Sequence, residues 1–166
     1  MGERAVPEPV NNEGDEMMAA ITGAIGLGHA GDRVAARDEL ERLWGETEDP
    51  LHRCTIAHFV ADLQESVADE LMWDERALAV AADLTDERAQ QYDASFQVRA
   101  FRPSLHLNLA DAHRRLGHVA DAHRHLTAAD ADLDLLPDDD YGRLIRTGRE
   151  KIRRALAEGS TDPLPA

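Results

Sequence analysis

The sequence of 166 residues contains a single cysteine, Cys54, and aromatic residues make up only 4% of it. One cysteine excludes an intramolecular disulfide and any zinc site that needs several thiolates. Basic residues are scarce beside acidic ones: 18 Lys and Arg stand against 33 Asp and Glu, which gives a formal net charge of −15. Such a charge argues strongly against a general nucleic-acid-binding surface and against a surface for anionic membranes.

Long apolar runs are also missing. The most apolar N-terminal stretch, residues 17–30, is shorter than the roughly 20 residues that a membrane-spanning helix needs. Acidic residues precede this stretch, whereas a signal peptide begins with a basic region. We therefore expect a cytoplasmic protein without a targeting segment.

The remaining composition indicates a soluble, folded chain of about one domain, since 43% of the residues are apolar and 31% are charged. Ala, Leu, Arg, Asp and Glu dominate, which is typical of helices. The abundance of Ala, Arg and Asp also resembles that of bacterial proteins from high-GC actinobacteria. We predict one helical domain over residues 16–158, with disordered tails at residues 1–15 and 159–166.

Apolar residues recur with helical spacing through nearly all of this domain, and no alternating run flanked by hairpin turns interrupts them. The sequence therefore predicts an all-α fold. Asp32 and Pro50 suit the first positions of two of the helices. In the fourth helix we expect Leu71, Leu78 and Ala82 to face inward. The predicted helices span residues 17–30, 32–44, 51–64, 68–84, 103–116, 119–133 and 141–158.

Two segments of the chain need separate interpretation. Residues 85–102 have no clear period, and they are compatible with a further short helix or with an extended stretch over residues 97–101. The last predicted helix, 141–158, carries six basic residues around a narrow apolar stripe of Leu144, Ile145, Ile152 and Leu156. On a strongly acidic protein, we expect this helix to dock against neighbouring carboxylates rather than on a membrane.

Two of the predicted helix pairs share one spacing of small residues around a glycine. Small residues in mid-helix let antiparallel helices approach closely, and the glycine permits a tight turn between them. A third pair, marked by Ala57 and Ala77, fits the spacing loosely, with eight residues in excess. The shared positions are Ala24, Gly31, Ala36 and Leu43 in one pair, and Ala110, Gly117, Ala122 and Ala129 in the other.

This pattern resembles the tetratricopeptide repeat, a helix–turn–helix hairpin of about 34 residues. The best match starts at Asn108 and carries the family's Leu and small residue, its turn glycine, and the Ala-x3-Leu-x2-Ala run of the second helix. His106 and His113 stand where the family has large aromatics. The resemblance implies three degenerate hairpins over residues 17–133, stacked as a short α-solenoid with helix 141–158 as a cap. A helical bundle without such stacking remains the alternative.

In this family, the first helix of each hairpin lines a concave face that holds peptides. The side chains that face the groove by register with Ala24, Ala57 and Ala110 would be His29, His58, Asp62, Asn108, Asp111 and Arg115. This polar set suits a basic or mixed polar segment, although a solvated helix face is the simpler interpretation. A clamp for a terminal carboxylate is disfavoured, because no Lys accompanies Asn108 and Asp111 would repel the carboxylate.

Two short motifs suggest other chemistry, but their surroundings do not fit. Residues 26–31 match G-x-G-x-x-G, which binds dinucleotides only between a strand and a helix; here we predict a close helix crossing instead. The acidic run at residues 130–140 lacks the Gly and Glu of a calcium-binding EF-hand loop. Its carboxylates at residues 138–140 are instead expected to stabilise the start of the last helix.

The eight histidines do not form a recognisable metal motif. The spacings among His118, His123 and His125 scatter side chains around a helix. Two pairs have metal-compatible spacing, Asp121 with His125 and His58 with Asp62, but each supplies two ligands where structural zinc needs four. We therefore predict neither a metal nor a cofactor, and we expect Cys54 to be a small buried hydrophobe.

Together these features predict a non-catalytic module that binds another protein or a peptide through a polar concave groove. Two alternatives remain open. One is a small helical enzyme or metal-binding protein that uses a pocket of His58, Asp62, Asn108 and Asp111. The other is a structural oligomerisation unit; a homo-oligomer is compatible with each of these functions.

Overall fold

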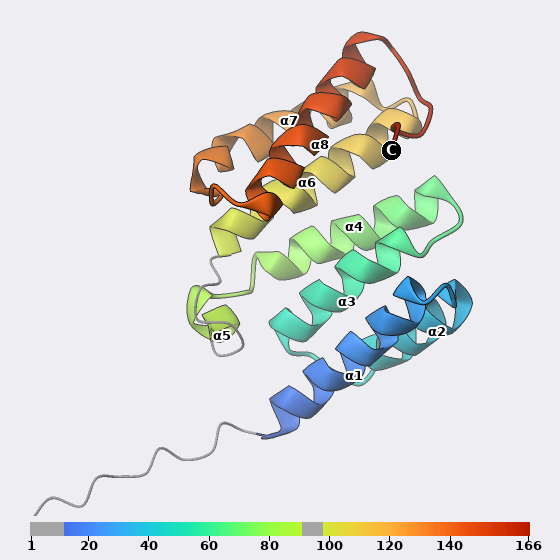
Figure 1. The fold of residues 1–166 in the computed structure, drawn as a ribbon, viewed down its shortest axis with the longest axis vertical. Coiled ribbons are helices and arrows are strands. Elements are labelled where there is room, and N and C mark those ends of the chain that lie inside the picture. Colours follow the sequence, from blue (N-terminus) through green and yellow to red (C-terminus); the bar gives the residue numbers. More distant parts are fainter. Residues whose placement is uncertain (1–11, 91–97) are drawn as a thin grey trace, which may run out of the picture.

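The computed structural model describes residues 12–90 and 98–166, and this described part is helical without any strand (Figure 1). The all-α prediction is confirmed. The elements are α1 (Asn12–His29), α2 (Arg33–Trp44), α3 (Pro50–Asp62), α4 (Val67–Ala81), α5 (Asp86–Gln90), α6 (Val98–Arg115), α7 (Val119–Ala131), a short 3₁₀ helix η1 (Leu133–Leu135) and α8 (Asp140–Ala157). None of the described helices is both long enough and apolar enough to cross a membrane.

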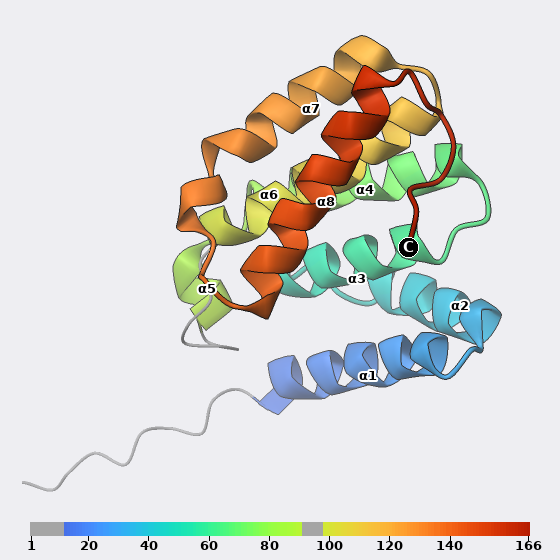
Figure 2. The same ribbon diagram turned by 45° about the horizontal axis from the view of Figure 1, so that its top comes forward.

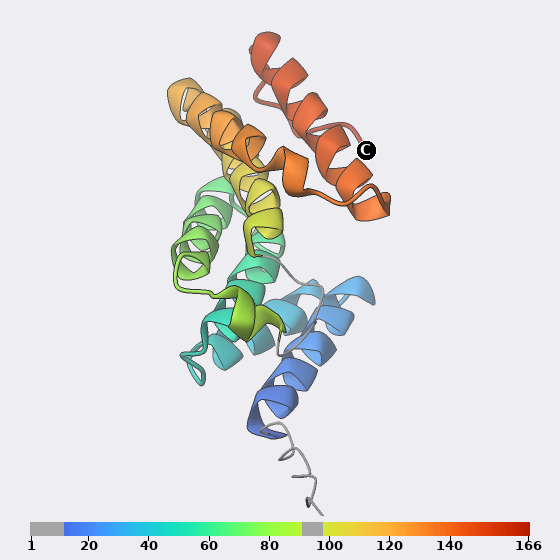
Figure 3. The same cartoon turned by 90° about the vertical axis from the view of Figure 1, so that its left-hand side faces the viewer.

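Six of the helices pair in sequence as antiparallel hairpins: α1 with α2, α3 with α4, and α6 with α7 (Figures 1 and 2). Each hairpin packs on the next, because α2 contacts α3 and α4 contacts α6. Helix α8 packs mainly on α6, which in Figure 3 lies between α4 and α8. One apolar core runs through the first two hairpins and reaches α6, and a smaller core lies between α6, α7 and α8.

The shared small residues lie where the helices approach one another. Ala36, Ala110 and Ala122 have no exposed surface. Gly31 and Gly117, in the turns of the first and third hairpins, have φ values of 99° and 79°, a conformation that residues with a Cβ atom rarely adopt. The repeat spacing thus predicted both the buried small residues and the turns.

Helix starts follow the local capping chemistry of the sequence. The side chain of Asp32 accepts a hydrogen bond from the Ala35 N–H at 3.1 Å and caps α2, as predicted. Pro50 is the first residue of α3, after the capping Asp49. The predicted acidic start of the last helix is confirmed by Asp139, which caps α8.

Two helices begin five residues earlier than predicted. Helix α1 starts at Asn12, inside the segment that we expected to be a tail. Helix α6 starts at Val98, so the extended conformation suggested for residues 98–101 is wrong; residue 97 lies outside the described residues. The first turn of α6 is held in place because Val98 is buried and its N–H donates to Asp86 Oδ1 at 2.9 Å. The short helix suggested for this region is confirmed by α5.

The inward face predicted for α4 is only partly correct: Leu78 packs against the larger core, but none of the three predicted residues is fully buried. Leu71 and Leu78 are only half-buried and Ala82 is exposed, whereas the buried residues are Trp73, Asp74, Ala77 and Ala81. Trp73 packs edge-to-face on Trp44 of α2, with the ring centroids 5.2 Å apart. The spacing of apolar residues missed the buried face of α4, because one position of that face is occupied by an acidic residue, Asp74.

The C-terminal segment also differs from the prediction, because residues 160–165 pack on the domain rather than forming a loose tail. The guanidinium of Arg114 donates to the backbone carbonyls of Ser160 and Asp162, at 2.7 and 2.8 Å. The Lys151 ammonium donates to the carbonyl of Pro165 at 3.2 Å, and Leu164 packs on the smaller core.

The start of α8 depends on a glycine. A Cβ atom at Gly142 would lie 1.9 Å from the Pro137 carbonyl oxygen, whereas one at Gly148 on the same helix would meet nothing within 4 Å. We expect Gly142→Ala to lower the free energy of unfolding by about 2 kcal/mol through overpacking. Gly148→Ala should raise it by about 0.5–1 kcal/mol. Urea unfolding of both variants tests this contrast, and equal effects of the two substitutions would contradict it.

Candidate functional site

A groove of about 380 Å³ lies between α3, α6 and α8. Its polar wall contains four of the six predicted groove residues: His58 and Asp62 from α3, and Asn108 and Asp111 from α6. The opposite wall is formed mainly by apolar side chains of α8. The remaining lining residues are Phe101, Ser104, Leu107, Tyr141, Leu144, Ile145, Gly148, Ile152 and Leu164.

His58 is held in a defined orientation. Its ring packs edge-to-face on Phe59 and Phe101, with centroids 5.3 and 5.6 Å away. The Asn108 amide nitrogen lies 3.3 Å from His58 Nδ1 and can only donate, so Nδ1 accepts and the proton of the neutral ring is on Nε2. Burial lowers the pKa of His58, although Asp62 acts in the opposite direction. His58 is therefore a neutral donor and acceptor at pH 7.

The two carboxylates of the groove differ in their partners. Asp111 is held by both neighbouring arginines: Arg114 Nη2 donates to Oδ1 at 2.7 Å, and Arg115 Nε donates to Oδ2 at 2.9 Å. Asp62 is exposed, and within the described residues its carboxylate accepts no hydrogen bond. The Arg33 guanidinium binds the backbone carbonyl of Asp62 instead, at 2.7 Å. Asp62 is thus the carboxylate of this groove that remains available to a cationic partner.

The apolar wall of the groove was not predicted. Leu144 keeps 68% of its surface exposed, so its prediction as part of the buried stripe is wrong; Tyr141, which was not assigned to that stripe, keeps 40% exposed. Ile152 and Leu156 of the same helix are buried, in agreement with the predicted stripe. Helix α8 therefore uses one end of its apolar face for packing and leaves the other end open beside the polar wall.

Two predicted groove residues lie elsewhere. His29 is exposed at the end of α1 and lines a separate hollow of about 180 Å³, which Asp62 borders as well. Arg115 lies behind the groove wall, where its Nη2 donates to Glu70 Oε1 of α4 at 2.5 Å. The expectation that Arg115 lines the groove is wrong, because Glu70 and Asp111 fix its guanidinium in an ion-pair network.

Next to this network is a buried acid that the sequence did not reveal. Asp74 is only 2% exposed, and among the described residues neither of its carboxylate oxygens has a hydrogen-bond partner. Burial raises the pKa of Asp74 to about 8; the charges of Glu70 and Asp62 add to the increase and Arg115 opposes it. Asp74 is therefore largely protonated at neutral pH.

The predicted docking of α8 on a neighbouring carboxylate is confirmed for Arg149, whereas Arg143 and Arg153 pair with acidic residues of α8 itself. Arg149 binds Asp130 of α7 through two hydrogen bonds of 2.8 and 2.7 Å, and this contact joins the last helix to the third hairpin.

Cys54 is also as predicted: it is buried, and burial raises the pKa of its thiol to about 12. A thiol of this kind is not a nucleophile at neutral pH.

Four histidines form a row between α6 and α7. Nδ1 of His106 lies 3.1 Å from Nδ1 of His125, whose ring stacks on His113 at a centroid distance of 5.4 Å. His113 in turn contacts His118. Burial is the main cause that lowers the pKa of His106 and His113, and it lowers that of His125 to about 4. His123 is exposed and takes no part in these contacts, so the expected scatter of His118, His123 and His125 holds for His123; the row forms because α6 supplies His106 and His113 and Gly117 ends the helix between His113 and His118.

The chain matches no protein-family model, no curated protein and no solved structure.

Proposed function

We propose that this chain is a helical-repeat module of the tetratricopeptide type, a short α-solenoid that binds an extended peptide segment of another protein in the groove between α3, α6 and α8. The observation that carries the proposal is the meeting of four predicted polar residues with an exposed apolar wall in one groove. The in-order packing of three hairpins and the motif that starts at Asn108 support the repeat assignment.

The two walls define the chemistry of the partner. Asp62 offers an exposed carboxylate to a Lys or Arg side chain of the partner. His58 and Asn108 offer hydrogen-bond donors and acceptors to the backbone of the partner peptide. Leu144 and Tyr141 offer apolar surface on the other side. The partner is therefore a segment with a basic residue and a nearby apolar residue, bound without a cofactor.

The C-terminal segment of the chain, which has no helix or strand and ends beside the groove, supports the proposal by the contacts that it makes. Arg114 donates to two of its carbonyl groups, and the Leu164 side chain lines one end of the groove. A partner peptide would use the same kinds of contact: side-chain donors for the backbone and an apolar surface for a side chain.

Selection of peptides from a random library on the immobilised protein tests the proposal. We expect the enriched peptides to pair a basic with an apolar residue. Asp62→Asn and Leu144→Glu should each weaken the binding of an enriched peptide by about tenfold, since each loses about 1.4 kcal/mol of contact free energy. Affinities measured by isothermal titration calorimetry provide the comparison.

The matched control is Val34→Glu, which places a charge on an equally open apolar residue of α2, 55% exposed and outside the groove. This variant should bind like the wild type. A library that yields no enriched peptide, or peptides that bind all four proteins equally, would refute the proposal.

A further inference from the structure

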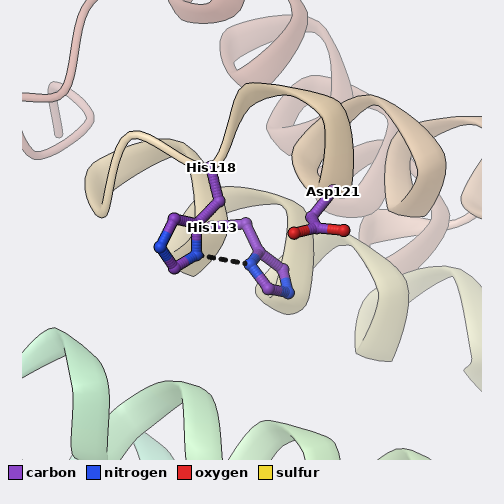
Figure 4. A group of neighbouring side chains, drawn as sticks. All are labelled: His113, His118 and Asp121. Carbon is purple, nitrogen blue, oxygen red and sulfur yellow. Dashed lines mark hydrogen bonds between the residues drawn. The ribbon is translucent and has the colours of Figure 1, made fainter.

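Three potential metal ligands meet at the turn between α6 and α7. His113 comes from the last turns of α6, His118 lies directly before α7, and Asp121 belongs to the first turn of α7 (Figure 4). One ligand atom from each residue lies within 4.8 Å of the other two, and this is the only such group among the residues that the structure describes.

The spacing of the two imidazoles matches that of nitrogen ligands on one ion. Their Nδ1 atoms are 3.2 Å apart. Zinc–nitrogen bonds of about 2.0–2.1 Å at a tetrahedral angle place two nitrogen ligands about 3.3 Å from each other. Because these nitrogens share a hydrogen bond, one Nδ1 carries a proton that must move to Nε2 of its ring before both can bind a cation.

The turn of the third hairpin produces this arrangement. The left-handed conformation of Gly117 reverses the chain, and the His118 N–H donates to the carbonyl of His113 at 2.8 Å. This bond fixes the two backbones side by side. His113 is 7% exposed, whereas His118 is exposed, so an ion has a route to the site from solvent.

The acidic ligand is positioned as well. Arg124, one turn further along α7, donates a hydrogen bond to Asp121 Oδ1. A carboxylate has lone pairs for several partners, so Asp121 can bind Arg124 and a cation together. Hydrogen bonds of this kind orient metal ligands in proteins.

We propose that His113, His118 and Asp121 bind one divalent transition-metal ion of the zinc, cobalt or nickel class, with water in the remaining coordination position. Two imidazoles and one carboxylate suit such ions and disfavour calcium or magnesium, which prefer oxygen ligands. The bound ion would join α6 to α7 across their turn. The site is separate from the peptide groove, whose lining includes none of the three ligands.

Calorimetric titration of untagged, EDTA-treated protein with zinc chloride tests this site. We expect one ion per chain, and we expect His118→Ala and Asp121→Asn to weaken binding by more than about tenfold. His123→Ala is the matched control, because His123 is an exposed histidine of the same helix outside the group. Cobalt titration of the same proteins should give the strong visible absorption of tetrahedral Co²⁺ in the wild type and the control only.

Circular dichroism of each variant verifies that the fold is retained. The proposal is overturned if the wild type binds no stoichiometric zinc, or if His118→Ala binds zinc as tightly as the wild type. It is also overturned if His125→Ala abolishes binding while His118→Ala does not, since the ion would then belong to the His106–His125 pair.

Discussion

Asp74→Asn should abolish a loss of stability that the wild-type protein suffers between pH 5 and pH 8. Asp74 is buried on α4, and its pKa is raised from an ordinary value of 3.8 to about 8, mainly by burial. The folded protein therefore keeps this proton up to about pH 8, whereas the unfolded chain releases it near pH 4. The folded state binds more protons in this interval, so stability falls as pH rises.

The expected loss in the free energy of unfolding follows from the width of this pH interval. Each pH unit of this interval corresponds to about 1.4 kcal/mol, which gives a loss of about 4 kcal/mol between pH 5 and pH 8. An amide at position 74 does not titrate, so the free energy of unfolding of Asp74→Asn should gain about this amount relative to the wild type over the same range.

Urea unfolding at several pH values measures this difference. The control is Glu75→Gln, which removes one exposed acid of the same helix and should change stability by less than about 0.5 kcal/mol at every pH. Parallel pH profiles for the wild type and Asp74→Asn would contradict this account, because Asp74 would then titrate as an ordinary carboxylate.

Arg114→Met should lower the free energy of unfolding by about 3 kcal/mol and release the C-terminal segment. The Arg114 side chain is 1% exposed, and its guanidinium binds Asp111 as well as two carbonyl groups of the segment. Methionine fills the space but donates no hydrogen bond. Removal of one partner of a buried ion pair costs roughly 3–5 kcal/mol, and Asp111 retains Arg115 as a partner, which places the loss at the lower end.

The released segment provides an independent readout. Limited proteolysis or amide exchange should show that residues 160–166 become accessible in Arg114→Met before the helices unfold. Arg42→Met is the matched control: Arg42 is exposed and pairs with Glu39 and Glu46, and because exposed ion pairs contribute little to stability, this substitution should have a much smaller effect than Arg114→Met. Equal destabilisation by the two substitutions, or a segment that stays protected, would contradict the role assigned to Arg114.

Much of the fold could be predicted because local chemistry determines it. Capping residues such as Asp32 and Asp139 mark helix starts in the sequence as they do in the structure. The start of α6 could not be predicted, since Val98 is held by the side chain of Asp86, a contact that depends on tertiary structure. The same holds for the C-terminal segment, whose main partner Arg114 is 46 residues away from Ser160.

The candidate site was predictable on one side only. Helical register placed His58, Asp62, Asn108 and Asp111 together, and they do line one groove. The register of α8 against α6 depends on side-chain packing, so the helical spacing wrongly assigned the exposed Leu144 to the buried stripe.

Two buried or clustered groups escaped prediction for different reasons. Asp74 lies on the buried face of α4, and it was missed because an acidic residue in a helix is normally expected to face solvent. The contact between His113 and His118 crosses a helix end, where helical spacing no longer applies. The spacing around Gly117 was the one available signal, because a turn glycine between two histidines brings them together.

The central claim, that the groove between α3, α6 and α8 holds a peptide, is tested most directly by mapping a selected peptide on isotope-labelled protein by NMR. We predict that the amide signals that shift belong to the residues around His58, Asp62, Asn108 and Leu144. Shifts concentrated instead on α2 and α7, away from the groove, would contradict the claim.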